Sequence, residues 1–141
     1  LQRARAAAVG GHARVYDTNK NRNWKAEAAW FMETELAKQG KRAPLIPEGP
    51  IQLMVAAVFT CPKSAHRKRE PAPARWKTTK PDLDNVAKAV KDAAKGILWL
   101  DDAQVVEMIC RKYNARQGRS PCVIVEVNGV QIDFPVLLEA A

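Results

Sequence analysis

Four aspartates, arranged as two close pairs, are the residues of this sequence best suited to metal chemistry. Asp82 and Asp84 are separated by one residue, and Asp101 and Asp102 are adjacent. Carboxylates that share one site repel each other and raise each other's pKa unless a cation neutralises them. An all-oxygen ligand set suits Mg²⁺ or Mn²⁺ rather than zinc. Because such a cation can activate water and stabilise charge on a phosphodiester, the pattern favours metal-dependent phosphodiester hydrolysis.

One predicted helix separates the two pairs and must bring them together. Pro81 followed by an aspartate is typical of a helix start, and apolar residues then recur at helical spacing until Gly96, a typical stop. A helix of about a dozen residues is roughly 18 Å long. If the chain reverses at Gly96, the second pair returns beside the first. The alternative is structural, with the first pair capping the helix and the second making a turn.

A basic segment interrupted by prolines, residues 63–80, precedes the first pair. Pro71 and Pro73 exclude a regular helix through its middle, and we expect a long, mobile surface loop. In the functional interpretation its cations grip phosphates and its tryptophan stacks on an unpaired base. In the alternative interpretation it is a solvated insertion that the tryptophan only anchors. The candidate DNA-binding residues are Lys63, Arg67, Lys68, Arg69, Arg75, Trp76, Lys77 and Lys80.

The composition is that of one compact and basic domain. The chain has 141 residues, of which 47% are hydrophobic and 27% are charged, and we assign residues 1–141 to a single domain. Its 23 Lys and Arg residues outnumber 15 Asp and Glu residues, and the net charge of +8 favours a polyanion such as nucleic acid. The longest apolar run, residues 51–60, is far too short to span a bilayer, so we expect no membrane partner.

The cysteines and the N-terminus favour a cytoplasmic protein. Cys61, Cys110 and Cys122 are odd in number and widely spaced, which argues against a disulfide framework or a zinc site. We interpret them as free thiols in a reducing cytoplasm, although Cys110 and Cys122 could face each other across a hairpin. No secretory signal is visible, and because the sequence does not begin with Met we expect residues upstream of Leu1.

The remaining periodicities complete an α/β (α+β) pattern with two main helices. Apolar residues at helical spacing predict a helix from about residue 19 to Gln39, after a short strand over 13–16. Strands are predicted over 51–60, 104–113 and 122–127, and we expect the last two to form a β-hairpin. Asn128-Gly129 is a turn signal. The tail from 130 to 141 has no clear interpretation.

Two motifs in this order resemble the signature of the RusA family of Holliday junction resolvases. They are Lys80-Pro81-Asp82-Leu83-Asp84-Asn85, followed by Lys88, and Trp99-Leu100-Asp101-Asp102-Ala103-Gln104-Val105. The similarity is continuous over about 80–127 and collinear back to Arg3. It implies a homodimer with a mixed sheet that cuts four-way DNA junctions with Mg²⁺, in a bacterium or a phage.

The resemblance also implies roles for individual residues. Three metal-binding aspartates of the family fall on Asp82, Asp84 and Asp102, and a lysine important for cleavage falls on Lys88. Asp101 takes a supporting role. From spacing alone, Lys88 could equally be a plain surface lysine. The family's opening strand lies before or at Leu1, so the sheet edge is expected to be incomplete, and the basic loop varies too much in length for its DNA contacts to be transferred.

Symmetry supports a dimer independently of the resemblance. A four-way junction is approximately two-fold symmetric, and a C₂ dimer presents two identical sites related by one axis. Three rival functions remain at this stage: a nuclease for flaps or forks, a non-catalytic protein that binds branched DNA, and an RNA-binding module. The last lacks an aromatic strand motif of the kind that stacks on RNA bases.

Overall fold

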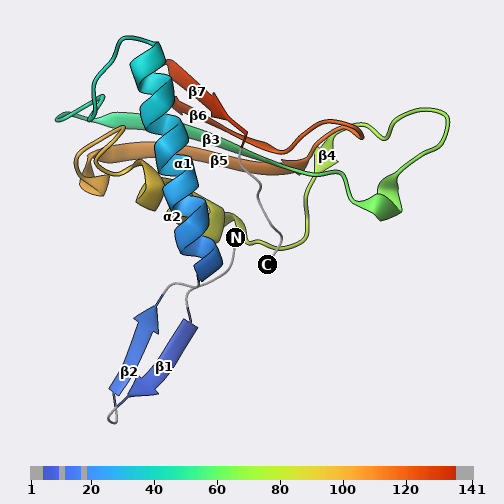
Figure 1. The fold of residues 1–141 in the computed structure, drawn as a ribbon, viewed down its shortest axis with the longest axis horizontal. Helices are drawn as coiled ribbons and strands as arrows, with labels where there is room; N and C mark the ends of the chain where they lie inside the picture. Colours follow the sequence, from blue (N-terminus) through green and yellow to red (C-terminus); the bar gives the residue numbers. More distant parts are fainter. Residues whose placement is uncertain (1–4, 10–11, 17–18, 136–141) are drawn as a thin grey trace.

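The computed structural model describes residues 5–9, 12–16 and 19–135 (Figure 1). Its elements in chain order are β1 (Arg5–Val9), β2 (His12–Tyr16), α1 (Asn19–Lys38), β3 (Ile51–Phe59), η1 (Lys63–Ala65), β4 (Arg75–Trp76), α2 (Leu83–Ala94), η2 (Asp102–Gln104), β5 (Val105–Asn114), β6 (Cys122–Val127) and β7 (Val130–Phe134). Strands β1 and β2 pair only with each other, and Figure 1 shows this hairpin projecting from the rest of the chain. The other five strands form one mixed sheet, which confirms the expected α+β class.

Both predicted helices are present, and each buries the apolar face that its sequence predicts. Trp24, Ala28, Met32 and Leu36 of α1 are buried, at the four-residue spacing of one helix face. In α2 the buried residues are Val86, Ala87, Ala89, Val90, Ala93 and Ala94. Gly96 follows with a φ of 84°, a conformation that glycine adopts without strain. The predicted helix end is therefore confirmed.

The predicted hairpin between residues 104–113 and 122–127 is wrong. The strand order is β4-β5-β3-β6-β7, so β3 lies between the two strands, parallel to β5 and antiparallel to β6. The physical reason is burial: nearly all of β3 is apolar and buried, and only an interior position in the sheet shields a strand on both sides. The unassigned tail supplies β7, which pairs with β6 through the predicted turn at Asn128-Gly129.

The two helices cover the same face of the sheet (Figure 1). Alternate residues of β3, from Ile51 to Phe59, point into the core with Val123, Val125 and Val127 of β6. Helix α1 contacts β7, and α2 contacts β3 and β5. Helix α2 therefore lies towards the β5 side of the sheet, and no helix of the described residues covers the opposite face.

The three cysteines are free thiols. Cys110 of β5 pairs with Val55 on one side of β3, and Cys122 of β6 pairs with Val58 on the other side. Because Val55 and Val58 differ by an odd number of residues, their side chains point to opposite faces, so Cys110 and Cys122 do not face each other. Among the described residues, no helix has the length and apolar character needed to cross a membrane.

Candidate active site

The first aspartate pair lies at the N-terminus of α2. Asp82 occupies the N-cap position with an extended backbone (φ −67°, ψ 150°), yet its side chain makes no capping hydrogen bond. Asp84 lies in the first turn of the helix and is exposed. Helix capping by its side chain therefore does not account for the carboxylate of Asp82.

Two lysines fix the chain that leads into α2. The Lys112 ammonium on β5 donates hydrogen bonds to the backbone oxygens of Thr79 (2.7 Å) and Pro81 (2.6 Å). The Lys77 ammonium donates to Thr79 Oγ1 (2.9 Å) and lies 5.0 Å from the centre of the Phe59 ring. Burial and the nearby Lys112 charge lower the pKa of Lys77. These contacts tie the start of α2 to the sheet, so the first aspartate pair has a fixed position.

The two aspartates of the second pair have different roles. Asp101 is the N-cap of η2, where its side chain accepts a hydrogen bond from the Ala103 N–H (3.0 Å) and forms a capping box with Gln104. Asp102 Oδ1 instead accepts a hydrogen bond from Nε1 of the fully buried Trp99 (2.8 Å). Asp101 thus shapes the turn, and Trp99 orients the carboxylate of Asp102.

The side chain of Gln104 attaches this turn to the rest of the fold. Its amide oxygen accepts from the backbone N–H groups of Leu100 and Asp101, both at 2.9 Å. Its amide nitrogen donates to the backbone oxygens of Ile46 and Gly49, both at 3.2 Å. One side chain therefore joins η2 to the loop before β3, which limits the movement of Asp102.

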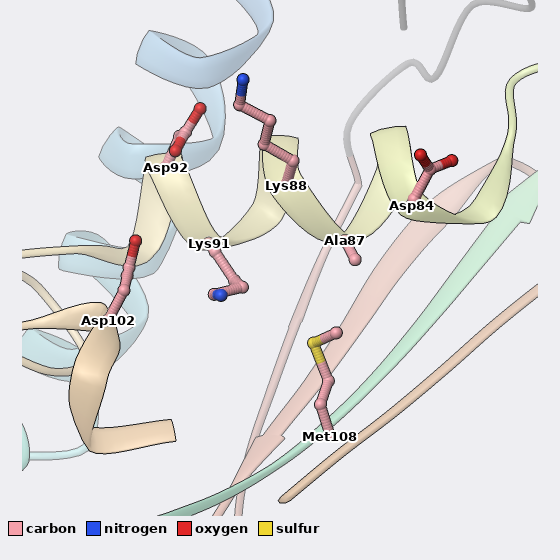
Figure 2. Close-up of a pocket in the computed structure, with 7 residues that line it drawn as sticks. All are labelled: Asp84, Ala87, Lys88, Lys91, Asp92, Asp102 and Met108. Atoms are coloured by element: carbon pink, nitrogen blue, oxygen red, sulfur yellow. The ribbon is translucent and has the colours of Figure 1, made fainter. Parts of the chain in front are cut away.

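Residues of α2, η2 and β5 line an open pocket of about 350 Å³ (Figure 2). Of the predicted site residues it contains Asp84, Lys88 and Asp102, whereas Asp82 does not line it. Figure 2 shows Asp84 near the start of α2 and Asp102 towards the other end of the pocket. The structure therefore places one aspartate of each pair and the predicted lysine in a common space.

Four further residues line the pocket and were not singled out from the sequence: Ala87, Lys91, Asp92 and Met108. Asp92 follows Lys88 by four residues and so lies on the same helix face, a spacing that could have identified it. Its carboxylate forms an ion pair of 3.0 Å with Lys25 of α1. Lys88 and Lys91 add two positive side chains to a lining that also carries three carboxylates, and positive side chains attract a phosphate.

The donor types of the pocket suit a hard divalent cation. Mg²⁺ is usually held in proteins by one or two carboxylates, while water and substrate phosphates complete its shell. Asp84 and Asp102 supply such carboxylates, and the Trp99 bond already orients one of them. Within residues 5–9, 12–16 and 19–135, however, no three acidic, His or Cys side chains lie close enough to hold a metal together. Convergence of Asp82, Asp84 and Asp102 on one ion therefore stays a prediction.

The basic loop is attached to the fold through Gln117. The Gln117 side chain accepts hydrogen bonds from the N–H groups of Arg67 (2.8 Å) and Ala72 (3.0 Å) and donates to the Arg67 backbone oxygen (3.1 Å). Its own N–H donates to the Ala72 oxygen (2.9 Å). Of the loop's predicted DNA-binding residues, Lys77 is buried, with 9% of its surface exposed. The others are exposed: Lys63, Arg67, Lys68, Arg69, Arg75, Trp76 and Lys80.

Trp76 lies beside a second, open pocket. Its indole is 69% exposed and contacts Tyr113 edge to face, with ring centres 6.4 Å apart. Ala74, Arg75, Trp76 and Tyr113 line a hollow of about 430 Å³. An exposed tryptophan beside a half-buried tyrosine, with an adjacent guanidinium, is a suitable platform for a flat, unpaired base.

Comparison with known proteins gives a consistent result. A protein family described as Endodeoxyribonuclease RusA matches residues 1–128. The chain is 30% identical over 131 residues to the uncharacterized protein YqaN of Bacillus subtilis (strain 168), an alignment that covers 89% of this chain and 88% of the relative. It is 28% identical over 120 residues to the crossover junction endodeoxyribonuclease rusA of Lactococcus phage r1t, covering 84% and 82%.

No solved structure matches the chain significantly. The family match nevertheless spans most of the sequence, including both aspartate pairs and every residue of the pocket around α2. The chain therefore belongs to the RusA family of endodeoxyribonucleases.

Proposed function

We propose that this endodeoxyribonuclease is a Mg²⁺-dependent homodimer, also active with Mn²⁺, that resolves four-way DNA junctions by paired, symmetric cuts. The observation that carries the proposal is the pocket beside α2 that Asp84, Lys88 and Asp102 all line. A relative from Lactococcus phage r1t is named as a crossover junction endodeoxyribonuclease. Three free thiols suit the reducing cytoplasm of a bacterial cell, where its DNA substrate would lie.

Each residue of the site has a role in this proposal. Asp82, Asp84 and Asp102 would hold the cation, which when bound activates water and neutralises charge on the phosphodiester. Trp99 keeps Asp102 turned towards the pocket through its 2.8 Å hydrogen bond. Lys88, one turn after Asp84, holds the scissile phosphate or stabilises charge on the attacking or leaving oxygen. The two positive side chains in the pocket also offset the repulsion between its carboxylates and the DNA.

The proposed DNA path includes the exposed part of the basic loop. The cations Lys63, Arg67, Lys68, Arg69, Arg75 and Lys80 would contact phosphates, and Trp76 would stack on a base unpaired at the junction centre. Lys77 is left out of this set, because its ammonium is bound to Thr79 and lies over Phe59. Its role is to fix the segment that leads into α2.

One experiment separates this proposal from its rivals. The protein is incubated with a four-way junction, a flap and a plain duplex, each with and without Mg²⁺, and cleavage and binding are measured on the same samples. We expect Mg²⁺-dependent cutting of the junction above the others. Equal or better cutting of the flap would indicate a general branched-DNA nuclease, and binding without cutting would indicate a non-catalytic protein. A cruciform plasmid tests the paired cuts, since two cuts in one binding event linearise it.

The variant Asp82→Asn tests the metal role of the first pair. It removes one negative charge near the phosphate, so we expect cleavage to be abolished while junction binding is kept or tightened. Calorimetry of Mg²⁺ binding to the free protein should show weaker binding in the same variant. Loss of binding and cleavage in parallel, in a protein that remains folded, would assign Asp82 a structural role instead.

A further inference from the structure

The outer edge of β5 is unpaired over most of its length within the described residues. Strand β3 lies on one side of β5, and β4 covers the other side only at Tyr113 and Asn114 (Figure 1). Three large apolar residues in this stretch are exposed: Val106 by 68%, Met108 by 41% and Ile109 by 44%. An exposed edge with free N–H and C=O groups and apolar side chains is a template for pairing with another strand.

Two features limit the free part of this edge. At the start of the strand an irregularity sets Val106 outside the regular ladder, because Ile51 pairs with Val105 and Gln52 with Glu107. At the other end the backbone oxygen of Lys112 accepts a hydrogen bond from the N–H of Lys77 (3.4 Å). The regular, unpaired ladder therefore covers residues 107–111, and its middle residue is Ile109.

We infer that this edge pairs antiparallel with the same edge of a second copy, with the two-fold axis at Ile109. The inference deepens the homodimer of the proposed function and rests on it. In this arrangement the free ladders of both copies are used completely, and each ends where the partner's β4 begins. The two five-stranded sheets become one continuous sheet with all four helices on the same face.

The charges on the strand favour the same axis. In an antiparallel pair centred on Ile109, Glu107 lies directly opposite the partner's Arg111, and the reciprocal pair forms on the other side of the axis. Opposite charges placed directly across a sheet stabilise the pairing, whereas like charges destabilise it. An axis at Met108 or at Cys110 would instead set one of these charges against Ile109. Only the central register is self-complementary, which selects a second copy rather than an unrelated strand as the partner.

The pairing also places the two pockets for paired cuts. Met108 points to the helix-covered face, as its partner Leu53 does, and lines the candidate active site. In the dimer it lies opposite the partner's Cys110. The two pockets therefore open on one face of the continuous sheet and flank the two-fold axis, as symmetric cleavage of a junction requires.

A charge-swap series tests the interface. The dissociation constant of the dimer is measured by sedimentation equilibrium at low salt for the parent, Glu107→Arg, Arg111→Glu and the double variant. Each single change makes two attractive pairs repulsive, so we expect the constant to rise about tenfold or more. The double variant restores opposite charges, and its constant should return to within about threefold of the parent. Asp133→Arg on β7 is the matched control, since it makes the same charge change at the opposite sheet edge.

Cross-linking provides a second measurement that does not depend on charge. Ile109→Cys should form an intermolecular disulfide on mild oxidation, because residues opposite each other across a sheet bring their Cβ atoms within disulfide reach. Mass spectrometry distinguishes a disulfide between the two copies of position 109 from bonds that involve the native thiols. The control Gln131→Cys on β7 should not cross-link at this rate.

The outcomes distinguish this inference from the proposed function. The β5 interface is overturned if neither single charge change alters the dissociation constant of the dimer. It is also overturned if the Ile109→Cys variant does not cross-link. A monomer that cuts junctions overturns the interface and the homodimer but leaves the nuclease. A dimer that follows the charge swaps yet cuts no DNA supports the interface and overturns the proposed function.

Discussion

The hydrogen bond between Trp99 and Asp102 provides the sharpest test of how the candidate active site is built. Trp99→Phe removes the indole N–H that Asp102 Oδ1 accepts at 2.8 Å and leaves the carboxylate without its orienting donor. Trp24→Phe is a matched control. Trp24 is also buried, at 6% exposed, but its Nε1 has no hydrogen-bond partner among the described residues.

The magnitude follows from the difference between the two variants. Both lose a similar volume from the core, so the packing and cavity costs largely cancel. A hydrogen bond to a charged group contributes about 1.5–3 kcal/mol to stability. Asp102 is only partly buried, which favours the lower half of that range. Trp24→Phe removes a buried donor that has no partner among the described residues, so no bond within them is lost. We expect Trp99→Phe to lower the free energy of unfolding by about 2 kcal/mol more than Trp24→Phe.

Activity should separate the variants further. Residues that orient a metal ligand typically contribute 10–100-fold to metal affinity or rate. In single-turnover cleavage with the junction fully bound, Trp99→Phe should therefore raise the Mg²⁺ concentration for half-maximal rate by about tenfold or more. Trp24→Phe should leave that concentration unchanged. If the two variants lose equal stability, and their Mg²⁺ requirements agree within threefold, the Trp99 bond does not position Asp102 and the reasoning is refuted.

Three other predictions follow from the site, the loop and the cysteines. Lys88→Ala should lower the single-turnover rate far more than it lowers junction affinity, and Lys95→Ala is the control. Lys88→Arg should keep partial activity at best. A change in rate below about threefold, or ~0.7 kcal/mol, would mean that Lys88 takes no part in catalysis. Replacing Arg67, Lys68 and Arg69 together with Ala should flatten the slope of log K against log salt by up to about 0.9 per lost phosphate contact, and an unchanged slope would mean that the loop does not bind DNA. Burial raises the pKa of Cys110 to about 11, so its alkylation at pH 8 should be roughly 100-fold slower than that of an ordinary thiol and should quicken with rising pH; fast alkylation in the folded protein would contradict this.

Much of this protein follows from its sequence, because the relevant signals are local. The apolar stripes of α1 and α2 and the turn at Asn128-Gly129 depend on residues within a few positions of one another. The same holds for the two aspartate pairs, which lie at the ends of elements whose limits can be predicted. The net charge of +8 follows from the composition alone.

Packing decided which segments distant in the chain become neighbours in the fold. Alternation within 104–113 and 122–127 shows which residues share a face, but not which strand lies beside each. The insertion of β3 between them follows from its need to be shielded on both sides. Lys77 shows the same limit. The sequence groups it with the DNA-binding cations, whereas packing places its ammonium over Phe59 and binds it to Thr79.

The site shows the same division. The sequence by itself determined that two aspartates and Lys88 lie near the start of α2 and that the second aspartate pair lies just before β5. Only the tertiary structure decided that Met108 of β5 joins them and that Lys25 of α1 pairs with Asp92. These contacts join segments that become neighbours when the two helices pack on one face of the sheet, and no periodicity along a single segment encodes the distance between two of them.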